Sequence, residues 1–250
     1  MAAPIIQIED LYKSFGGNHV LQGINLSIMP GTTQVILGGS GSGKSVLMKH
    51  MIGLLKPDSG RVIVDGEDIA PLPESELSRV RKKFGMVFQG AALFDSMNVY
   101  ENVAFPLREH FKHMPEREIR EKVHQKLSVV GLEDVDERFP DELSGGMRKR
   151  VGLARAIVLE PKIVLYDEPT TGLDPITTDY VDEMILGAKQ KLGVTSVVIS
   201  HDIASAFKVA DQIAFLYQGK LVAQGTPSEM RHATHPQVHE FLSTWFGKNE

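Results

Sequence analysis

The feature of this sequence that most constrains its fold is a glycine-rich segment between a predicted strand and a predicted helix. Residues 38–45 read Gly-Gly-Ser-Gly-Ser-Gly-Lys-Ser, which matches the pattern G-x-x-x-x-G-K-[ST] in full. The apolar run 34–37 before it predicts a buried strand, and the residues after it predict a helix that ends near Lys56. A strand that turns tightly into a helix is typical of layered α/β proteins, so this segment predicts that fold class.

Each residue type in this segment, called the phosphate loop below, suits the binding of a polyphosphate. Glycines let backbone N–H groups curl around the anion where a Cβ would obstruct it, and the following helix aims the positive end of its dipole at the same point. Lys44 would reach the β- and γ-phosphates, and the Ser45 hydroxyl would ligate Mg²⁺. The loop therefore predicts a nucleoside-triphosphate site without saying how the nucleotide is used. The predicted nucleotide contacts are Gly38, Gly39, Ser40, Gly41, Ser42, Gly43, Lys44 and Ser45.

A second group of polar residues follows two other apolar runs. Asp167 and Glu168 end the predicted strand 162–166, and His201 directly follows the predicted strand 196–200. The carboxyl ends of parallel strands meet at the nucleotide crevice of an α/β sheet. We expect Asp167 to hold Mg²⁺ or its waters and Glu168 to act as general base toward the attacking water. His201 would contact the γ-phosphate and position that water.

A second anion-binding device precedes the predicted helix 148–159. Residues 143–147, the signature segment, read Leu-Ser-Gly-Gly-Met, so that a serine and two glycines stand at a helix N-terminus. One nucleotide has one γ-phosphate, and the phosphate loop already provides its cradle. Two such devices in one chain therefore predict that each nucleotide is held jointly with a second copy of the chain.

Short apolar runs alternate with helix-like segments along the chain, except between about residues 91 and 159, where the pattern is mostly helical. A helical insertion is thus expected to interrupt an α/β core. Near the C-terminus, Thr226 and Glu229 form a predicted capping box. The apolar stripe after it packs either on its own domain or on a partner copy, and its members are Val238, Phe241, Leu242 and Trp245. Other strands are predicted at 5–9, 21–28, 61–65, 85–88, 212–217 and 220–223, and helices at 74–84, 115–130 and 174–192.

Composition limits the function classes. The 250 residues contain 27 Lys and Arg against 32 Asp and Glu, a formal charge of −5, which disfavours a non-specific nucleic-acid binder. The sequence has no cysteine, which excludes a disulfide scaffold and a thiol nucleophile. The first residues lack the pattern of a signal peptide, and no apolar run approaches the ~20 residues that span a bilayer. Composition alone therefore predicts a soluble, mildly acidic protein of the cytoplasm.

Together these motifs resemble an ABC-transporter ATPase subunit in their order and spacing, over nearly the whole chain from Ile5 to about Phe246. The resemblance implies a P-loop NTPase (RecA-like) core with an antiparallel β-subdomain and an inserted α-helical subdomain. It divides the single domain 1–250 into a core at about 1–88 and 160–225, a helical subdomain at about 89–159 and a C-terminal helical tail at about 226–250. The motifs that carry the resemblance are residues 38–45, Gln89, residues 143–147, 166–168 and 171–174, and His201.

The same resemblance implies further residue roles. Tyr12, 26 residues before Gly38, would stack on adenine. Gln89 would join the catalytic residues and the Mg²⁺ ligands and link them to a transmembrane partner. Asp174 would couple the two nucleotide sites of a dimer. The signature residues Ser144, Gly145 and Gly146 would clasp the γ-phosphate of the ATP held by the opposite subunit.

Three features narrow the resemblance to the ATPases of Mla-type bacterial lipid transporters, which contain MCE proteins. They are Met147 where most of the superfamily has Gln, the basic run 148–150, and the segment 92–108. A thioether cannot replace the donors of an amide, so a polar contact from side chain 147 is not expected. The implied partners are a second copy of the chain, an integral membrane permease, an MCE substrate-binding protein and an accessory cytoplasmic subunit. The implied location is the cytoplasmic face of the inner membrane, where the protein would be peripheral.

The sequence thus predicts ATP hydrolysis by a dimer that powers lipid, specifically phospholipid, transport, with no nucleic acid as partner. The alternatives are the ATPase of another ABC transporter class and a soluble ABC ATPase that acts on nucleic acid or ribosomes. Against the soluble class, only 53 residues separate Gln89 from Leu143, with no sustained heptads for a long coiled coil. A small-molecule kinase would leave the signature segment unexplained.

Overall fold

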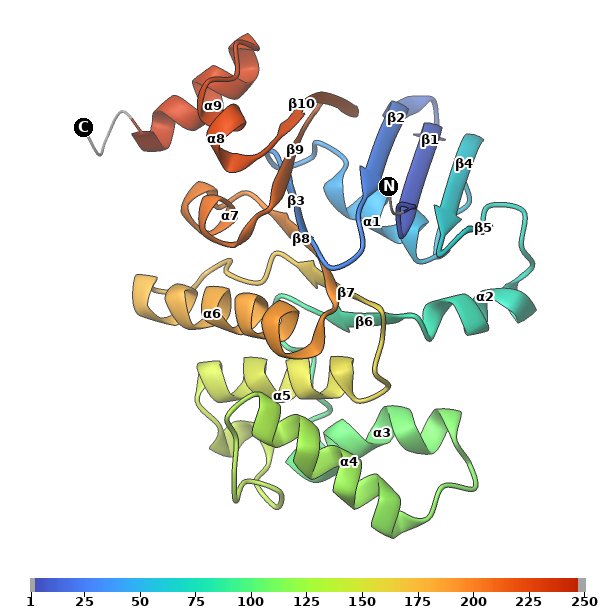
Figure 1. Cartoon of the computed structure of the whole chain (residues 1–250), viewed down its shortest axis with the longest axis vertical. Helices are drawn as coiled ribbons and strands as arrows, with labels where there is room; N and C mark the ends of the chain where they lie inside the picture. The colour runs from blue at the N-terminus through green and yellow to red at the C-terminus, as the bar shows by residue number, and fades with distance from the viewer. Residues whose placement is uncertain (1–2, 247–250) are drawn as a thin grey trace.

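The central sheet of the protein has six strands, five of them parallel, in the order β10-β9-β3-β8-β7-β6 (Figure 1). The structure is a computed structural model that describes residues 3–246. The antiparallel strand β10 forms one edge of the sheet and the parallel strand β6 forms the other. The strands are β3 (Thr33–Leu37), β6 (Phe84–Val87), β7 (Ile163–Asp167), β8 (Thr195–Ser200), β9 (Gln212–Tyr217) and β10 (Lys220–Gly225).

Apolar residues cover both faces of this sheet, which is why its strands appear in the sequence as continuous apolar runs. In β3, Val35 and Leu37 point into one hydrophobic cluster and Ile36 into another on the opposite face. The same alternation divides Val164 from Leu165 in β7. Both faces of the sheet therefore need a covering layer.

A second, antiparallel sheet covers one face, in the order β2-β1-β4-β5. The strand expected at 5–9 is longer than predicted, because a bulge at Asp10 carries β1 on to Phe15. Asp10 has a φ of 44°, and Asn25 supports the bulge by accepting a hydrogen bond from its N–H and donating one to its carboxylate. This sheet consists of β1 (Ile6–Phe15), β2 (Asn18–Ile28), β4 (Ser59–Val64) and β5 (Glu67–Asp68).

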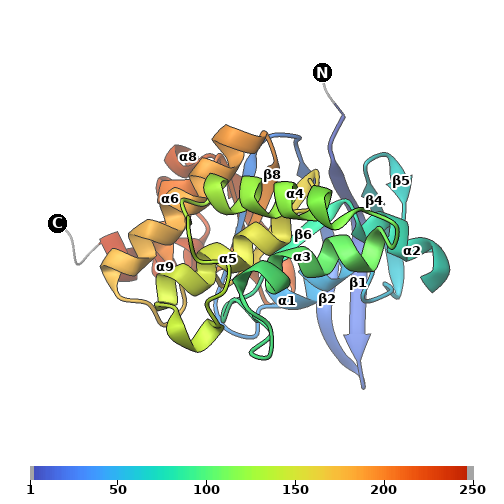
Figure 2. The same cartoon turned by 90° about the horizontal axis from the view of Figure 1, so that it is seen from below.

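Helices complete both layers. The helices α1 (Lys44–Met51) and α2 (Glu74–Arg81) lie with the antiparallel sheet, whereas α6 (Pro175–Leu192) and α7 (Ile203–Val209) cover the other face. Between β6 and β7 the chain forms the helical insertion, drawn in green and yellow in Figures 1 and 2, where α3, α4 and α5 lie side by side. Its elements are α3 (Val99–His110), α4 (Glu116–Val129), the short 3₁₀ turn η1 (Pro140–Glu142) and α5 (Gly145–Ile157).

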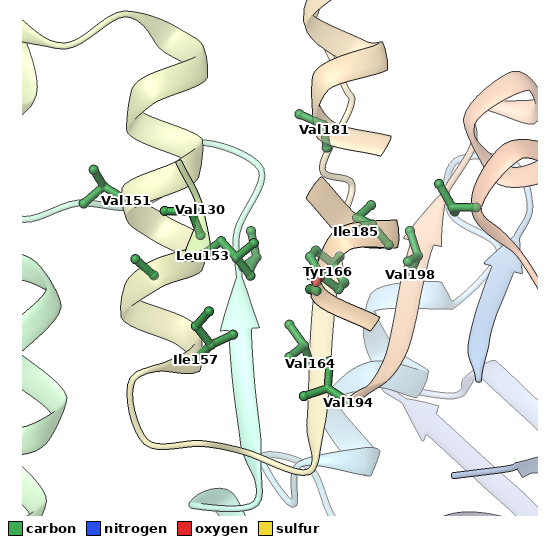
Figure 3. Packing of buried hydrophobic residues seen from close by; sticks show 14 of the residues in the cluster. Val130, Val151, Leu153, Ile157, Val164, Tyr166, Val181, Ile185, Val194 and Val198 are labelled. Carbon is green, nitrogen blue, oxygen red and sulfur yellow. The ribbon is translucent and has the colours of Figure 1, made fainter. Parts of the chain in front are cut away.

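Buried packing anchors α5 to the central sheet. Figure 3 shows Leu153 and Ile157 of α5 in one buried cluster with Val164 and Tyr166 of β7 and with Ile185 of α6, and α5 directly contacts the edge strand β6. Because α5 is held along its length by this apolar contact, the helix N-terminus has a defined place relative to the strand end of β7.

The C-terminal helices are α8 (Pro227–Arg231) and α9 (Pro236–Phe246). The predicted capping box of Thr226 and Glu229 is present. In α9, Val238 and Leu242 are buried, and the Phe241 ring meets Phe215 of β9 at 5.0 Å between centroids. The stripe therefore packs on its own chain. The side chain of Trp245 and residues 247–250 of the predicted tail lie outside the described part of the chain.

Three predicted helix limits were wrong by a few residues. The helix after the phosphate loop, expected to end near Lys56, ends at Met51. The helix expected at 74–84 ends at Arg81, because Phe84 already pairs with Ile163 as the first residue of β6. The helix expected at 148–159 begins at Gly145, since the signature glycines form its first turn. Among residues 3–246, none of the helices has the length and apolar character that crossing a membrane requires.

One buried carboxyl group joins the two helices that follow the strand ends of β7 and β8. Asp182 of α6 is 3% exposed and accepts a hydrogen bond from the hydroxyl of Ser205 in α7. Burial raises the pKa of Asp182 to about 6, with Asp202 and Asp179 adding to the rise and Ser205 and Lys208 opposing it. In the unfolded chain the pKa of an aspartate is about 3.9.

This pKa shift predicts a pH dependence of stability. Since the folded state holds the Asp182 proton more tightly, its stabilising contribution is complete below about pH 4 and is lost as pH rises through about 6. We expect the free energy of unfolding of the wild type, minus that of Asp182→Asn, to fall by about 2 kcal/mol between pH 4 and pH 7. Urea denaturation of both proteins across this range measures the difference, and a constant difference would contradict the prediction.

Candidate nucleotide-binding site

The phosphate loop connects the carboxyl end of β3 to the N-terminus of α1, as predicted. Two of its glycines have left-handed backbone angles, Gly41 with a φ of 74° and Gly43 with a φ of 107°. Gly43 stands at the helix N-cap, and no side chain caps α1 there. The first N–H groups of α1 are thus free of a side-chain partner and available to an anion.

Close packing against β9 fixes the start of the loop. A Cβ on Gly38 would come within 2.3 Å of the Leu216 carbonyl oxygen, so only glycine fits at this position. The Ser42 carbonyl accepts a hydrogen bond from the N–H of Gly219 at 3.2 Å. Inside the loop, the Ser42 hydroxyl is buried and has no hydrogen-bond partner among the described residues. A buried orphan hydroxyl of this kind fits a loop that receives a polar ligand.

Lys44 is folded back into the loop and is only 7% exposed. Its ammonium group donates hydrogen bonds to the carbonyl oxygens of Gly38 at 2.8 Å and Gly39 at 3.0 Å. The same nitrogen lies 3.5 Å from Oε1 of Glu168. One cation therefore bridges the phosphate loop and the acidic end of β7.

Glu168 is held from several sides. Its φ of 49° turns the chain sharply after β7, and its N–H donates to the Ile199 carbonyl at 2.9 Å. Oε2 accepts a hydrogen bond from the Thr171 hydroxyl at 3.1 Å and lies 2.7 Å from Nδ1 of His201. Because Lys44 approaches the other oxygen, the carboxylate has little freedom to rotate.

Asp167 occupies the last position of β7, half-buried beside Glu168. Burial, followed by the charge of Glu168, raises the pKa of Asp167. A divalent cation next to this carboxylate would offset both effects. The three predicted metal ligands carry oxygen donors, namely the Ser45 hydroxyl, the Gln89 amide and the Asp167 carboxylate, which suits Mg²⁺.

Three other predicted residues stand at exposed positions around this centre. Ser45 lies in the first turn of α1, and Gln89 follows the carboxyl end of β6, the neighbour of β7. The Tyr12 ring on β1 is 47% exposed. Its hydroxyl oxygen lies close to Gly23, where an added Cβ would come within 2.8 Å of that oxygen. Tyr12 thus has a free aromatic surface, as stacking on a base requires.

The signature segment faces a different hollow. Ser144 caps α5 by accepting a hydrogen bond from the Met147 N–H at 3.2 Å, and Gly145 and Gly146 form the first turn. These residues line a hollow of about 650 Å³ together with Asp174. None of the phosphate-loop residues lines this hollow. The structure therefore separates the two anion-binding devices of one chain.

Asp174 stands at the N-cap of α6 on the wall of that hollow. Its carboxylate accepts hydrogen bonds from the N–H groups of Ile176 and Thr177, both at 3.0 Å. The Thr177 hydroxyl donates a third, which lowers the pKa of Asp174. Asp174 is thereby fixed at the end of the loop of residues 168–174, called the Glu168 loop below.

Contacts thus join three of the predicted residues directly, namely Lys44, Glu168 and His201. Sequence reasoning missed two side chains that hold the Glu168 loop. Thr171 belongs to a recognised motif, but nothing in the sequence except its closeness to Glu168 indicated that its hydroxyl donates a hydrogen bond to the Glu168 carboxylate. Lys149 donates to the Pro169 carbonyl across 20 residues, and the basic run that contains it served only to narrow the family resemblance.

Comparison with known proteins agrees with this geometry. The family model described as ABC transporter matches residues 21–171, more than half of the chain. A probable ribonucleotide transport ATP-binding protein, mkl of Mycobacterium bovis, is 45% identical over 95% of this chain and 66% of its own length. The chain therefore spans slightly less than two thirds of that relative.

Two further similarities cover more of the other protein. The intermembrane phospholipid transport system ATP-binding protein MlaF of Haemophilus influenzae is 40% identical over 95% of this chain and 90% of its own length. The dimeric structure of the ATP-binding cassette MJ0796, in a post-hydrolysis state bound to ADP and Pi, superposes with a TM-score of 0.79 at 31% identity, over 89% of this chain and 98% of that one. The predicted fold class is confirmed, and the chain belongs to the ABC transporter family, as a P-loop ATP-binding cassette.

Proposed function

We propose that this protein hydrolyses ATP as a dimer of identical chains, and that hydrolysis powers phospholipid transport by a membrane permease. The observation that carries the proposal is the position of the Glu168 carboxylate between Lys44 of the phosphate loop and His201. In this position Glu168 would act as the base, His201 would orient it and Lys44 would bind phosphate, at the carboxyl edge of a parallel sheet, where nucleotides bind in such folds.

ATP binding would draw on groups that are already in place. Its β- and γ-phosphates offer Lys44 charged acceptors in exchange for the carbonyls of Gly38 and Gly39. The buried Ser42 hydroxyl and the free N–H groups of α1 would gain partners, and Tyr12 would stack on adenine. Mg²⁺ held by Ser45, Gln89 and Asp167 would neutralise charge on the phosphate oxygens.

Hydrolysis needs a water in line with the γ-phosphorus. Glu168 would take a proton from this water as its oxygen attacks, while the bond between the γ-phosphorus and the bridging oxygen of ADP breaks. His201 and Thr171 hold Oε2 of Glu168, so that Oε1 is oriented toward the phosphate loop through Lys44. His201 would in addition contact the γ-phosphate.

A second copy would complete each site. Ser144, Gly145 and Gly146 line a hollow that the phosphate loop of the same chain does not reach, which leaves them open to the γ-phosphate of an ATP bound to another chain. The solved relative MJ0796 is a dimer with ADP and Pi, which supports such an arrangement. Asp174, on the wall of the same hollow, would couple the two sites.

The transported substrate is proposed from relatives. MlaF is named for intermembrane phospholipid transport, and the chain covers 90% of its length, against 66% for the mycobacterial relative named for ribonucleotides. The expected complex contains a permease, an MCE substrate-binding protein and an accessory cytoplasmic subunit, at the cytoplasmic face of the inner membrane.

The packing of Gly38 predicts a loss of nucleotide binding. Gly38→Ala places a Cβ against the Leu216 carbonyl and displaces the loop, at a cost of about 1–3 kcal/mol. We expect the Kd for a non-hydrolysable ATP analogue to rise about tenfold in equilibrium binding. Gly187→Ala in α6, where a Cβ meets nothing within 4 Å, is the matched control and keeps the wild-type Kd. Equal affinities for both variants would refute this role of the loop.

The role of Glu168 predicts a second outcome. Glu168→Gln removes the base but keeps the shape of the side chain, so kcat for ATP should fall at least about 10²-fold. ATP-bound dimers should accumulate and be visible by size-exclusion chromatography. Glu121→Gln, which alters an exposed carboxylate on α4, is the control and retains wild-type turnover. Undiminished hydrolysis by Glu168→Gln would show that another group is the base.

The transport proposal predicts a membrane complex. Tagged protein purified from detergent-solubilised membranes of its own host should bring down a multispanning permease, identified by mass spectrometry. Extracted phospholipid should be enriched in the same fraction relative to a mock purification. Recovery of the protein only with ribosomes or DNA would reject the transporter function while leaving ATP hydrolysis untouched.

A further inference from the structure

The helix α5 carries a group of basic side chains that all bind backbone carbonyls of other segments. Within residues 3–246, none of these side chains forms an ion pair with a carboxylate. Each bond ties α5 to a different part of the fold. The pairs are Arg148 with Leu143, Lys149 with Pro169, Arg150 with Gly131, and Arg155 with Ala91 and Ala92.

Lys149 differs from the other three in what it reaches. Its acceptor, the Pro169 carbonyl, belongs to the residue that directly follows Glu168. The side chain is 8% exposed, and burial lowers the pKa of its ammonium group. A buried ammonium group is destabilising unless it has partners, and among residues 3–246 the Pro169 carbonyl is the one hydrogen-bond acceptor of Lys149. Because the Pro169 carbonyl directly follows Glu168, the bond from Lys149 can hold the Glu168 loop in place.

The other end of the connection is the signature segment. Lys149 lies five residues after Ser144 in the sequence, little more than one helical turn along α5. Lys149 and Ser144 line the same hollow, in which Asp174 ends the Glu168 loop. One side chain therefore connects the helix whose N-terminus faces a partner's nucleotide to the loop that carries this chain's own base.

The neighbouring bonds make this connection stiff. Arg148 holds the segment before α5 through the Leu143 carbonyl at 2.5 Å, and Arg150 holds the turn after α4 through the Gly131 carbonyl at 2.9 Å. The helix α5 packs directly on the edge strand β6, and its Leu153 and Ile157 share a buried cluster with Val164 and Tyr166 of β7, the strand that leads into Glu168 (Figure 3). A displacement of the α5 N-terminus would thus be passed to Pro169 rather than absorbed within the helix.

We propose that Lys149 is a positioning residue, which fixes the Glu168 loop to α5 so that a nucleotide engaged at Ser144–Gly146 sets the placement of Glu168 in the same chain. This inference rests on the proposed hydrolysis of ATP by a dimer. It gives the two composite sites a physical link inside each chain: the signature segment serves one site, Glu168 serves the other, and Lys149 joins them.

The test compares four purified proteins, wild type, Lys149→Met, Lys149→Arg and Lys126→Met, in steady-state ATP hydrolysis, equilibrium binding of an ATP analogue and thermal unfolding. Lys149→Met keeps the length of the side chain and removes the donor, whereas Lys149→Arg restores donors in a site that borders the hollow. Lys126 is the matched control, because it is a buried lysine that pairs with Glu160 outside the Glu168 loop.

We expect kcat of Lys149→Met to fall about tenfold while its Kd for the analogue stays within about twofold, since Lys149 does not touch the phosphate loop. Lys149→Arg should recover kcat to within about threefold of the wild type. Lys126→Met should lose thermal stability and keep kcat. Should Lys149→Met fail to fold, Lys149→Ala, which shortens the side chain beside the hollow, is held to the same expectation.

Three results would overturn the inference: a kcat for Lys149→Met near the wild type, a parallel rise in Kd that accounts for the loss, or the same loss of kcat in Lys126→Met. Failure to recover activity with Lys149→Arg would count against the donor as the cause. Absence of hydrolysis in the wild type would be a different failure, that of the proposed function itself, so the two are distinguishable.

Discussion

The Glu168 residue is the point at which three segments of the chain meet. Lys44 brings the phosphate loop to Oε1, His201 and Thr171 bring the end of β8 and the Glu168 loop to Oε2, and the backbone N–H of Glu168 is bonded to Ile199. A left-handed backbone angle at a glutamate is strained, and it persists here because its surroundings fix it from every side. Much of the remaining fold serves to bring those segments together: the sheet order places β3 beside β8, and β8 beside β7.

Local sequence patterns predicted the parts of this arrangement that local forces determine. Continuous apolar runs identified the strands of the central sheet, because those strands are buried on both faces. The glycine-rich loop and the capping box at Thr226 were predictable because a few adjacent residues satisfy their geometry. The bulge at Asp10 was not predictable, because the hydrogen bonds that hold Asp10 within β1 come from Asn25, 15 residues away in the sequence. The same reason explains why β1 was predicted to end at Glu9.

The residues of the candidate site likewise differ in whether the sequence could identify them. Residues that a motif contains, such as Lys44, Glu168 and Ser144, could be named from spacing alone. Side chains that act across the fold could not: the partner of Lys149 lies 20 residues away, beyond the end of α5 and the strand β7. The basic run 148–150 served only to narrow the family resemblance, because a run of charges does not indicate which groups it will contact. Here each of the three binds a carbonyl of another segment.

Met147 fits this account of α5. Its side chain is partly buried against the main hydrophobic cluster, while its N–H is the group that Ser144 caps. Position 147 therefore contributes apolar packing and a backbone donor, and the proposed anion binding by the segment would rest on Ser144, the glycine N–H groups and the helix dipole. A methionine at this position removes no backbone contact from the proposed phosphate site, because the N–H of residue 147 is unaffected by its side chain. Arg148 and Arg150, the basic side chains on either side of Lys149, are thus bonded to backbone carbonyls of neighbouring segments, so that the proposed contact with phosphate at this helix end would depend on the backbone and on Ser144.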